Sequence, residues 1–160
     1  MMVSADDIFM KEAFKEAVTA FEADEVPIGA VIVHNNTIVA RAHNQVEMLK
    51  DPTAHAEMIA VTQACATLAR KWLNGCTVYV TIEPCSMCAG ALVLARVSRL
   101  CVGAMDPKAG ACGSVVNVAR HNSLNHRIDV VSGIQADACG GIVSEFFQKK
   151  RRSGSKAATG

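Results

Sequence analysis

The chain has 160 residues, of which 51% are hydrophobic and 19% charged, with 11 Gly and 4 Pro. This length suits one domain, and the composition excludes disordered, collagen-like and low-complexity chains. Residues 1–148 carry 11 Lys and Arg against 15 Asp and Glu, a net charge of −4, whereas residues 149–160 carry 5 basic residues and no acid. We therefore expect one folded domain over residues 1–148 and a basic, partly disordered tail over residues 149–160.

The beginning of the sequence and its cysteine content indicate the cellular compartment. The first residues, MMVSADDIFMKEA, hold acids where a secretory signal needs a basic segment, and no apolar run reaches the about 18 residues that span a bilayer. The 7 cysteines are an odd number and too sparse for a disulfide scaffold. We expect an intracellular, cytoplasmic protein without a membrane partner, whose cysteines are thiols or metal ligands.

The first third of the chain predicts a helix followed by a β-hairpin. Ser4 and Asp7 resemble a capping box, and apolar residues then recur at helical spacing as far as Phe21. The β-branched runs 26–33 and 37–42 are separated by a short turn segment that contains two Asn, which tolerate the positive φ of a tight turn. We expect these two runs to pair.

The rest of the chain alternates between helices and strands. Thr53 suits the N-cap of a helix that starts near Ala54, and Pro84 suits the first turn of a second helix. Strands are expected at 76–82, 99–103 and 128–133, a loop at 105–114 and a closing helix at 137–150. This order predicts an α/β protein with a largely mixed or parallel sheet that helices cover on both faces. The fold class that we expect is a three-layer α/β/α sandwich around a central mixed five-stranded sheet.

The residues with the clearest chemistry are a His-Ala-Glu triplet at 55–57 and a Pro-Cys-Ser-Met-Cys segment at 84–88. Each group lies at the beginning of a predicted helix. One imidazole and two thiolates, from His55, Cys85 and Cys88, make three ligands for tetrahedral zinc and leave the fourth position for water, as in catalytic sites. The partial positive charge of a helix N-terminus favours the thiolate form that binds metal.

Glu57 is predicted to transfer protons rather than to bind the metal. Zinc lowers the pKa of a bound water from about 15.7 to about 7, and a neighbouring carboxylate can accept a proton and pass it on. Such a pair suits a reaction that needs a nucleophilic hydroxide and a protonated leaving amine.

Other interpretations of the Cys85–Cys88 pair are a structural zinc ribbon and a thioredoxin-like redox pair. A ribbon needs a second close cysteine pair, and the other 5 cysteines form none in the sequence. A redox pair leaves His55 and Glu57 without a role. A catalytic zinc site therefore explains more of the pattern, and the remaining cysteines are expected to fill the core.

With these residues, the sequence resembles the zinc-dependent cytidine deaminase superfamily, whose signature combines H-x-E with P-C-x-x-C. Within it, the chain is similar to bacterial tRNA-specific adenosine deaminases from the first helix to about Arg152. The similarity includes EVPIGAVIV at 25–33, DPTAHAEM at 51–58 and VYVTIEPCSMCAGA at 78–91. It departs from the family at Met105, which is Arg in some relatives, and at Arg120, which replaces a His; both changes bear on anticodon contacts.

The resemblance implies one zinc per subunit, a homodimer, and conversion of the wobble adenosine of an arginine tRNA to inosine. It implies that His55, Cys85 and Cys88 hold the zinc and that Glu57 is the catalytic proton shuttle. It further assigns the substrate-binding residues Asn44 at the base and ribose, Ile28 in the base pocket, Asp106 at the nucleotide backbone, and Phe146. Asp106 is alternatively a turn residue before Pro107, and at least one of Phe146 and Phe147 is alternatively a core residue of the last helix.

The basic tail and the choice of substrate leave alternatives. The residues Lys149, Lys150, Arg151 and Arg152 suit either a solvated end or phosphate contacts, and the resemblance to tRNA enzymes favours the latter. A free nucleobase or nucleoside deaminase for guanine, cytosine or cytidine would share the zinc chemistry. A non-catalytic, zinc-folded RNA-binding subunit ranks lower because Glu57 is present.

Overall fold

The computed structural model describes the backbone of residues 3–158 and the surroundings of the side chains of residues 3–154. Its elements in chain order are α1 (Ala5–Glu22), β1 (Gly29–His34), β2 (Thr37–His43), α2 (Val46–Leu49), α3 (Ala56–Leu68), β3 (Cys76–Ile82), α4 (Ser86–Leu94), β4 (Arg99–Ala104), β5 (Asp129–Val131) and α5 (Ala136–Ala158). In this part of the chain no helix is long and apolar enough to cross a bilayer.

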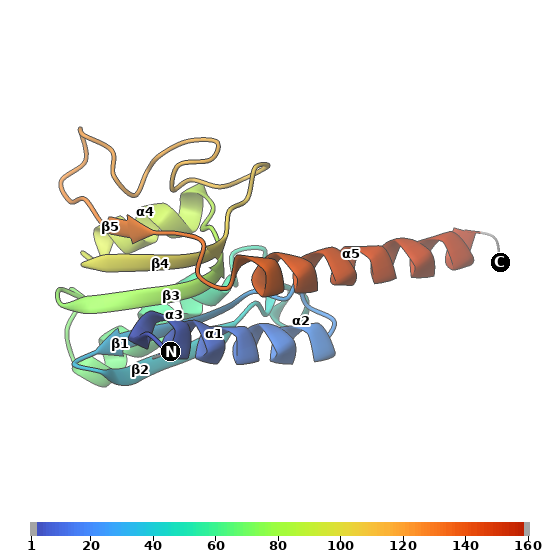
Figure 1. Cartoon of the computed structure of the whole chain (residues 1–160), viewed down its shortest axis with the longest axis horizontal. Coiled ribbons are helices and arrows are strands. Elements are labelled where there is room, and N and C mark those ends of the chain that lie inside the picture. The colour runs from blue at the N-terminus through green and yellow to red at the C-terminus, as the bar shows by residue number, and fades with distance from the viewer. Residues whose placement is uncertain (1–2, 159–160) are drawn as a thin grey trace.

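The five strands form one sheet in the order β2-β1-β3-β4-β5 (Figure 1). β1 pairs antiparallel with both β2 and β3, whereas β3, β4 and β5 are parallel to one another. Helices α1 and α5 cover one face of the sheet and α3 and α4 the other. The expected three-layer sandwich with a mixed five-stranded sheet is therefore confirmed.

The alternation of side chains along the strands divides the core between the two faces. Ile32 of β1 and Val78 of β3 pack in the cluster under α3 and α4, while the neighbouring Val31 and Tyr79 pack in the cluster under α1 and α5. Successive side chains of a strand point to opposite faces, so a strand buried on both sides is apolar throughout. This explains the continuous apolar sequences of β1, β3 and β4.

Helix α1 begins as its sequence predicts and lies directly on β1. Ser4 Oγ accepts a hydrogen bond from the Asp7 N–H at 3.1 Å and donates one to Asp7 Oδ2 at 2.8 Å, which completes the cap. A Cβ added at Gly29 would lie 2.1 Å from the carbonyl oxygen of Ala13. Only glycine permits this close approach of helix and strand. The segment that connects α1 to β1 thereby lies along the cleft that also contains His55.

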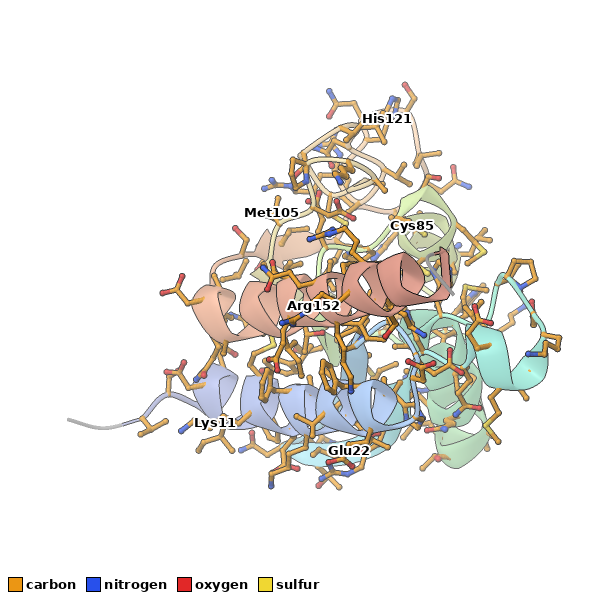
Figure 2. The ribbon with its side chains drawn as sticks, turned by 90° about the vertical axis from the view of Figure 1, so that its right-hand side faces the viewer. Lys11, Glu22, Cys85, Met105, His121 and Arg152 are labelled. Carbon is orange, nitrogen blue, oxygen red and sulfur yellow. The ribbon has the colours of Figure 1, made fainter. Side chains whose placement is uncertain are left out.

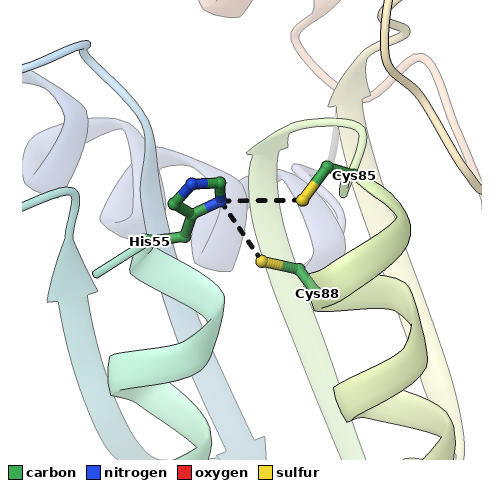
Figure 3. A group of neighbouring side chains, drawn as sticks. All are labelled: His55, Cys85 and Cys88. Carbon is green, nitrogen blue, oxygen red and sulfur yellow. Dashed lines mark hydrogen bonds between the residues drawn. The ribbon is translucent and has the colours of Figure 1, made fainter. Parts of the chain in front are cut away.

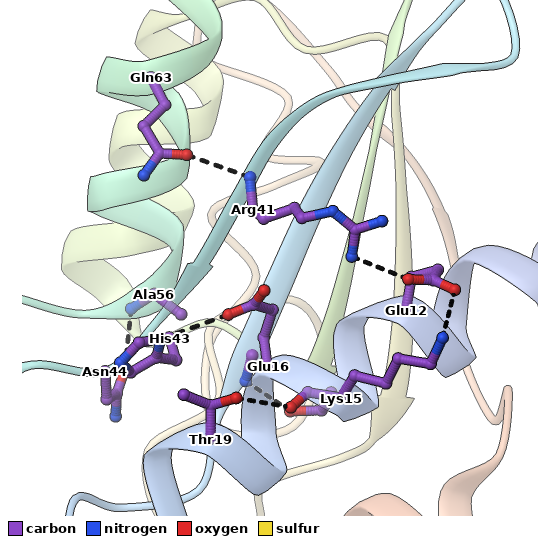
Figure 4. Close-up of polar contacts among 11 residues, drawn as sticks. Glu12, Lys15, Glu16, Thr19, Arg41, His43, Asn44, Ala56 and Gln63 are labelled. Atoms are coloured by element: carbon purple, nitrogen blue, oxygen red, sulfur yellow. Dashed lines mark hydrogen bonds and ion pairs between the residues drawn. The ribbon is translucent and has the colours of Figure 1, made fainter. Parts of the chain in front are cut away.

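The edge strand β2 is covered by polar contacts from the helices on both faces (Figure 4). Arg41 pairs through Nη1 with Glu12 Oε2 of α1 at 2.8 Å, and the Arg41 N–H donates to Gln63 Oε1 of α3 at 3.0 Å. His43 Nδ1 lies 3.3 Å from Glu16 Oε2. Unpaired backbone groups of an edge strand can pair with strands of other molecules, and the bond to Gln63 occupies one such group, the Arg41 N–H. Together these contacts hold in place the strand that leads to Asn44.

Two helix boundaries differ from those expected from the sequence. Helix α3 begins at Ala56 with His55 as its N-cap, because Thr53 instead bonds to Asp51 Oδ1 through its N–H (2.8 Å) and hydroxyl (2.7 Å). Helix α5 continues to Ala158 instead of ending at residue 150, and the expected domain boundary between residues 148 and 149 lies inside it. Figure 1 shows this helix extending well beyond the sheet. Residues 149–158 are helical in this structure.

An ion pair joins the beginning of α1 to β4. Arg99 donates from Nη1 to Asp6 Oδ1 at 2.8 Å and from Nη2 to Oδ2 at 2.7 Å, and the Tyr79 hydroxyl donates to Oδ1 at 2.7 Å. The hydrogen bonds from Arg99, more than any other contact, lower the pKa of Asp6 to about 2. A carboxyl with a lowered pKa stabilises the fold above its unfolded pKa and loses this effect as pH falls towards its folded pKa.

Replacing Asp6 with Asn is therefore expected to lower the free energy of unfolding at pH 7 by about 1–2 kcal/mol, after allowance for partial exposure of the pair. The gap between wild type and variant should shrink by about half at pH 3, which lies between the folded pKa and an unfolded value of about 3.9. Urea unfolding at both pH values measures the gap, and an equal gap at both would contradict this linkage.

Candidate metal centre and substrate cleft

Three predicted metal ligands meet where α3 and α4 begin (Figure 3). The Nδ1 atom of His55 lies 3.6 Å from Cys85 Sγ and 3.4 Å from Cys88 Sγ. All three ligand atoms lie within 4.8 Å of one another. In tetrahedral zinc, bonds of about 2.0–2.1 Å to nitrogen and 2.3 Å to sulfur separate the two kinds of atom by about 3.5 Å. The cluster therefore has the donor set and the spacing of a zinc site.

Both helix ends contribute backbone geometry as well as side chains. His55 and Cys85 are the N-caps of α3 and α4, with extended φ and ψ of −79° and 152° and of −72° and 177°. An N-cap residue is not yet helical, so its side chain can turn towards residues that would lie on another face of the helix. This explains how His55 and Glu57, two residues apart, approach the same cluster.

A hydrogen bond between the two cysteine side chains favours the thiolate form of Cys85. A hydrogen bond from the Cys88 thiol, and further bonds from backbone N–H groups at the start of α4, lower the pKa of Cys85 to about 5. The same shared proton raises the pKa of Cys88, which is fully buried. A cation in the cluster would replace that proton and bind both sulfurs as thiolates.

Glu57 lies in the first turn of α3 and is 5% exposed. Its carboxyl group faces the Cys88 side chain, and burial raises its pKa to about 7, above the ordinary value near 4.5. His55, Cys85 and Cys88 form the ligand group and Glu57 is not part of it. A carboxyl held beside the ligands with a raised pKa can carry a proton in one step and release it in the next.

A cleft of about 820 Å³ opens beside His55. Asn44 lines it at its buried end, where its Oδ1 accepts the Ala56 N–H at 2.8 Å. This bond satisfies a free N–H at the start of α3 and leaves Nδ2 as the group that can donate to a ligand. Ile28, whose carbonyl accepts the Asn44 N–H at 3.1 Å, adds an apolar wall.

Helix α5 forms another wall of this cleft. Phe146 is 5% exposed and packs edge-on against Phe21 of α1 at 6.1 Å between ring centroids. It therefore belongs to the core of the helix layer and also lines the cleft. Lys150 lines the cleft as well and pairs through Nζ with Asp24 Oδ2 at 2.6 Å.

The other basic residues of α5 have different surroundings. Lys149 lies over the Phe21 ring with Nζ 5.4 Å from its centroid and is not one of the residues that line the first cleft. Arg151 lines a second cleft, and Arg152 is exposed on the projecting part of the helix (Figure 2). The helix thus spreads the four predicted phosphate contacts over several faces.

Asp106 lies in the second cleft, which has a volume of about 690 Å³ and shares Ile28 with the first. Asp106 Oδ1 accepts the N–H groups of Lys108 at 3.0 Å and Ala109 at 3.3 Å, the contacts of a turn residue. Met105 lines the same cleft and is 40% exposed. Asp106 and Met105 therefore line the second cleft, whereas His55 lines the first.

Two buried acids beside the clefts were not predicted from the sequence. Glu25 is 2% exposed and accepts the N–H groups of Glu47 at 2.9 Å and Met48 at 2.8 Å, which holds α2 against the first cleft. Glu83 is 3% exposed; burial raises its pKa, but hydrogen bonds from Ser114 and backbone N–H groups outweigh this and lower it. An acid directly before Pro84-Cys85, at the end of an apolar strand, was the sequence feature that could have revealed it.

The structure also bears on the alternatives for the cysteine pair. All 7 cysteines are free thiols, and 4 of those outside the cluster are buried while Cys65 is half-buried. Among the described residues, one group of side chains could hold a metal ion, and it consists of His55, Cys85 and Cys88. A zinc ribbon with four cysteines is therefore excluded for this part of the chain.

Comparison with known proteins defines the class first. Residues 3–151 match the model of the MafB19-like deaminase family, which covers most of the chain. The chain is also similar, over part of its length, to a solved structure of guanine deaminase from Bacillus subtilis. The two are 39% identical, with a TM-score of 0.59, over 62% of this chain and 64% of that one. The protein is thus a deaminase by fold, by sequence and by its His-Cys-Cys cluster.

Relatives of higher coverage specify the branch. The tRNA-specific adenosine deaminases of Bacillus subtilis and Aquifex aeolicus are 49% and 47% identical to the chain, over 94% and 92% of its length and 93% and 97% of theirs. A solved structure from a study of A-to-I editing by tRNA:A34 deaminases is 44% identical, with a TM-score of 0.81 over 84% of this chain and 98% of that one. The chain belongs to the family of tRNA-specific adenosine deaminases.

Proposed function

We propose that this protein hydrolyses the wobble adenosine of a tRNA with an arginine anticodon to inosine and ammonia. The observation that carries the proposal is the buried Glu57 beside the His55, Cys85 and Cys88 cluster, at the end of a cleft lined by Asn44. Identity of 41–49% to enzymes named for this reaction supports the substrate.

The metal proposed for the cluster is zinc, one ion per subunit, because the nitrogen and sulfur donors have the spacing of its tetrahedral ligands. When bound, zinc supplies a water whose pKa is lowered to about 7. Glu57 takes up a proton as the nucleophile attacks C6 of adenine and then delivers it to the departing amine. Burial raises the pKa of Glu57 to about 7, so near neutral pH both the carboxylate that accepts the first proton and the carboxyl that releases it are accessible.

The residues around the first cleft would select and orient the nucleotide. Asn44 would donate to the base or ribose through Nδ2, because its Oδ1 is occupied by the Ala56 N–H. Ile28 and Phe146 supply apolar wall for the flipped base. Asp106 and Arg151 of the second cleft would meet the nucleotide backbone near the target.

Deamination of a free nucleobase is the second function that the geometry allows, since the metal cluster serves it equally well and one partial structural relative is a guanine deaminase. The two functions predict different products. Purified protein would be incubated with an arginine tRNA transcript, free adenosine, guanine and cytidine, and inosine and ammonia would be measured. Release of ammonia from a free base or nucleoside with intact tRNA adenosine would reject the tRNA proposal, and absence of all products would favour a non-catalytic RNA-binding subunit.

We further propose a cytoplasmic homodimer. Leu94 of α4 is 80% exposed, and Trp72 and Leu124, which line a shallow groove beside it, are 42% and 43% exposed. Apolar side chains gathered on one face mark an interaction surface, and a second copy of the chain is the partner that we propose for it. Light scattering should give twice the chain mass of 16.9 kDa.

The basic residues of α5 are proposed to bind tRNA phosphates. Replacing Lys149, Lys150, Arg151 and Arg152 together with Gln keeps helix-forming side chains and removes four positive charges. If two of them contact phosphate, the plot of log affinity against log salt should become shallower by about 1.4–1.8. A control that replaces Lys15 and Lys71, both exposed and outside the two clefts, should change the slope less. Binding titrations at several salt concentrations measure both slopes, and equal slopes for the α5 variant and wild type would reject phosphate contacts by the helix.

A further inference from the structure

Glu83 is a buried acid with no part in the chemistry described above. It follows the last residue of β3 and precedes Pro84, so it connects the central strand to the turn that presents Cys85. Its own N–H donates to the carbonyl of Ala104 at the end of β4, at 2.9 Å. A residue fixed in this way to two strands can hold whatever its side chain binds at a constant distance from the metal cluster.

The Glu83 carboxylate accepts hydrogen bonds from both ends of the loop that comprises residues 106–114. Glu83 Oε1 accepts the Asp106 N–H at 2.9 Å and the Ser114 hydroxyl, while Oε2 accepts the N–H groups of Cys112 at 2.9 Å and Ser114 at 3.1 Å. Hydrogen bonds to a carboxylate are stronger than those between neutral groups, and a buried donor that loses its acceptor is costly. The carboxylate therefore organises residues 106–114 as a unit.

The loop leaves no space for the carboxylate to move. A Cβ added at Gly110 would lie 2.2 Å from the carboxylate carbon and from one of its oxygens. The adjacent Ala111 N–H donates to the Pro84 carbonyl at 2.9 Å, which ties the loop a second time to the turn before Cys85. Its other end, residues 105–108, lines the second cleft. One buried group thus links that cleft to the metal centre.

We propose that Glu83 is a positioning residue that holds the wall of the second cleft, residues 105–108, at the distance from the metal centre that the tRNA strand requires. This inference rests on the proposed tRNA substrate. Glu83 acts on substrate binding rather than on the chemical step, because its hydrogen bonds run to the loop and to β4 and not to His55, Glu57 or Asn44.

The isosteric change Glu83→Gln tests this division of roles. Its amide nitrogen can replace Oε1, where the Ser114 hydroxyl can rotate to accept a bond, while the remaining oxygen keeps the Cys112 and Ser114 N–H groups. The Asp106 N–H alone then loses its acceptor. We expect KM for tRNA to rise about tenfold, kcat to stay within about threefold, and metal content to remain at the wild-type level.

Hydrogen exchange supplies a readout that does not depend on activity. The amide of Asp106 should exchange at least about tenfold faster in the Gln variant, with the amides of α1 unchanged. Ser114→Ala is the matched control, because it removes one bond to Glu83 and leaves the carboxylate and its three N–H partners. That control should change KM by less than about threefold.

Gly110→Ala provides a second route, since it keeps the charge and displaces the carboxylate by steric contact. The Gly110→Ala variant should show the same rise in KM for tRNA, and it tests the proposal independently if the Gln variant does not fold. Unchanged exchange at Asp106, loss of metal, or a fall in kcat with normal KM would overturn the positioning role. Failure of the wild-type protein itself to deaminate tRNA would instead overturn the proposed function, and the exchange result would still decide whether Glu83 holds the loop.

Discussion

Replacement of Glu57 with Gln is expected to lower kcat on tRNA by about four orders of magnitude while the protein keeps its metal. General acid and base groups contribute about 10² to 10⁴ to a rate, and Glu57 would serve both proton transfers. The amide preserves size and polarity in a site that is 5% exposed, so the fold should be retained. Single-turnover assays with tRNA and metal analysis of the same preparation measure the two quantities.

A matched control separates proton transfer from a general change of charge. Glu22, which is exposed at the end of α1, gives the same change in charge when replaced with Gln and should leave kcat unaltered. Turnover of the Glu57 variant within tenfold of wild type would remove Glu57 from the mechanism. Loss of metal from that variant would make it a ligand instead.

Replacement of Cys88 with Ser is expected to remove most of the bound metal and, with it, nearly all activity. Cys88 is fully buried and faces both His55 and Glu57, and the ligand group in the described part of the chain contains no cysteine besides Cys85 and Cys88. Metal binding stabilises the folded state, and its loss should lower Tm by about 5–10 °C without unfolding the two core clusters. Metal analysis and thermal unfolding with and without chelator check this result.

The chelator provides an internal test of the cause. It should lower Tm of the wild type to nearly that of the Cys88 variant and leave the variant itself unchanged. Cys65→Ser, which alters a half-buried thiol outside the cluster, should keep its metal and its response to chelator. A full metal complement in the Cys88 variant would show that the ligand set is wrong.

Elements defined by their own local sequence were predicted well. The strand expected at 76–82 matches β3, Cys76–Ile82, and the Ser4 cap of α1 is present, because an apolar run and a capping box act over a few residues. The spacing in the sequence also predicted that His55, Cys85 and Cys88 would meet, since both motifs begin helices. Local signals of this kind do not depend on knowledge of the rest of the fold.

Features that depend on distant partners were not predicted. Thr53 is a good N-cap by propensity, but Asn44 from the end of β2 accepts the first helical N–H and His55 becomes the cap. Helix α5 was expected to end at residue 150 and continues beyond it; Lys150 in this part of the helix bonds to Asp24, 126 residues away. Glu83 gains its role from a loop 23 to 31 residues later in the chain. Such pairings are decided by tertiary structure.

The β1–β2 hairpin has its two ends at opposite places in the molecule. Ile28 and Asn44 bond across its open end beside the cleft, whereas Asn35 and Asn36 form an exposed tip with φ of 51° and 59°. A strand of six residues is about 20 Å long, so the tip and the cleft are separated by the length of the sheet. Exposed polar tips accept insertions with little cost to folding. An affinity tag or fluorescent reporter inserted between Asn35 and Asn36 would therefore lie at the end of the hairpin away from the cleft.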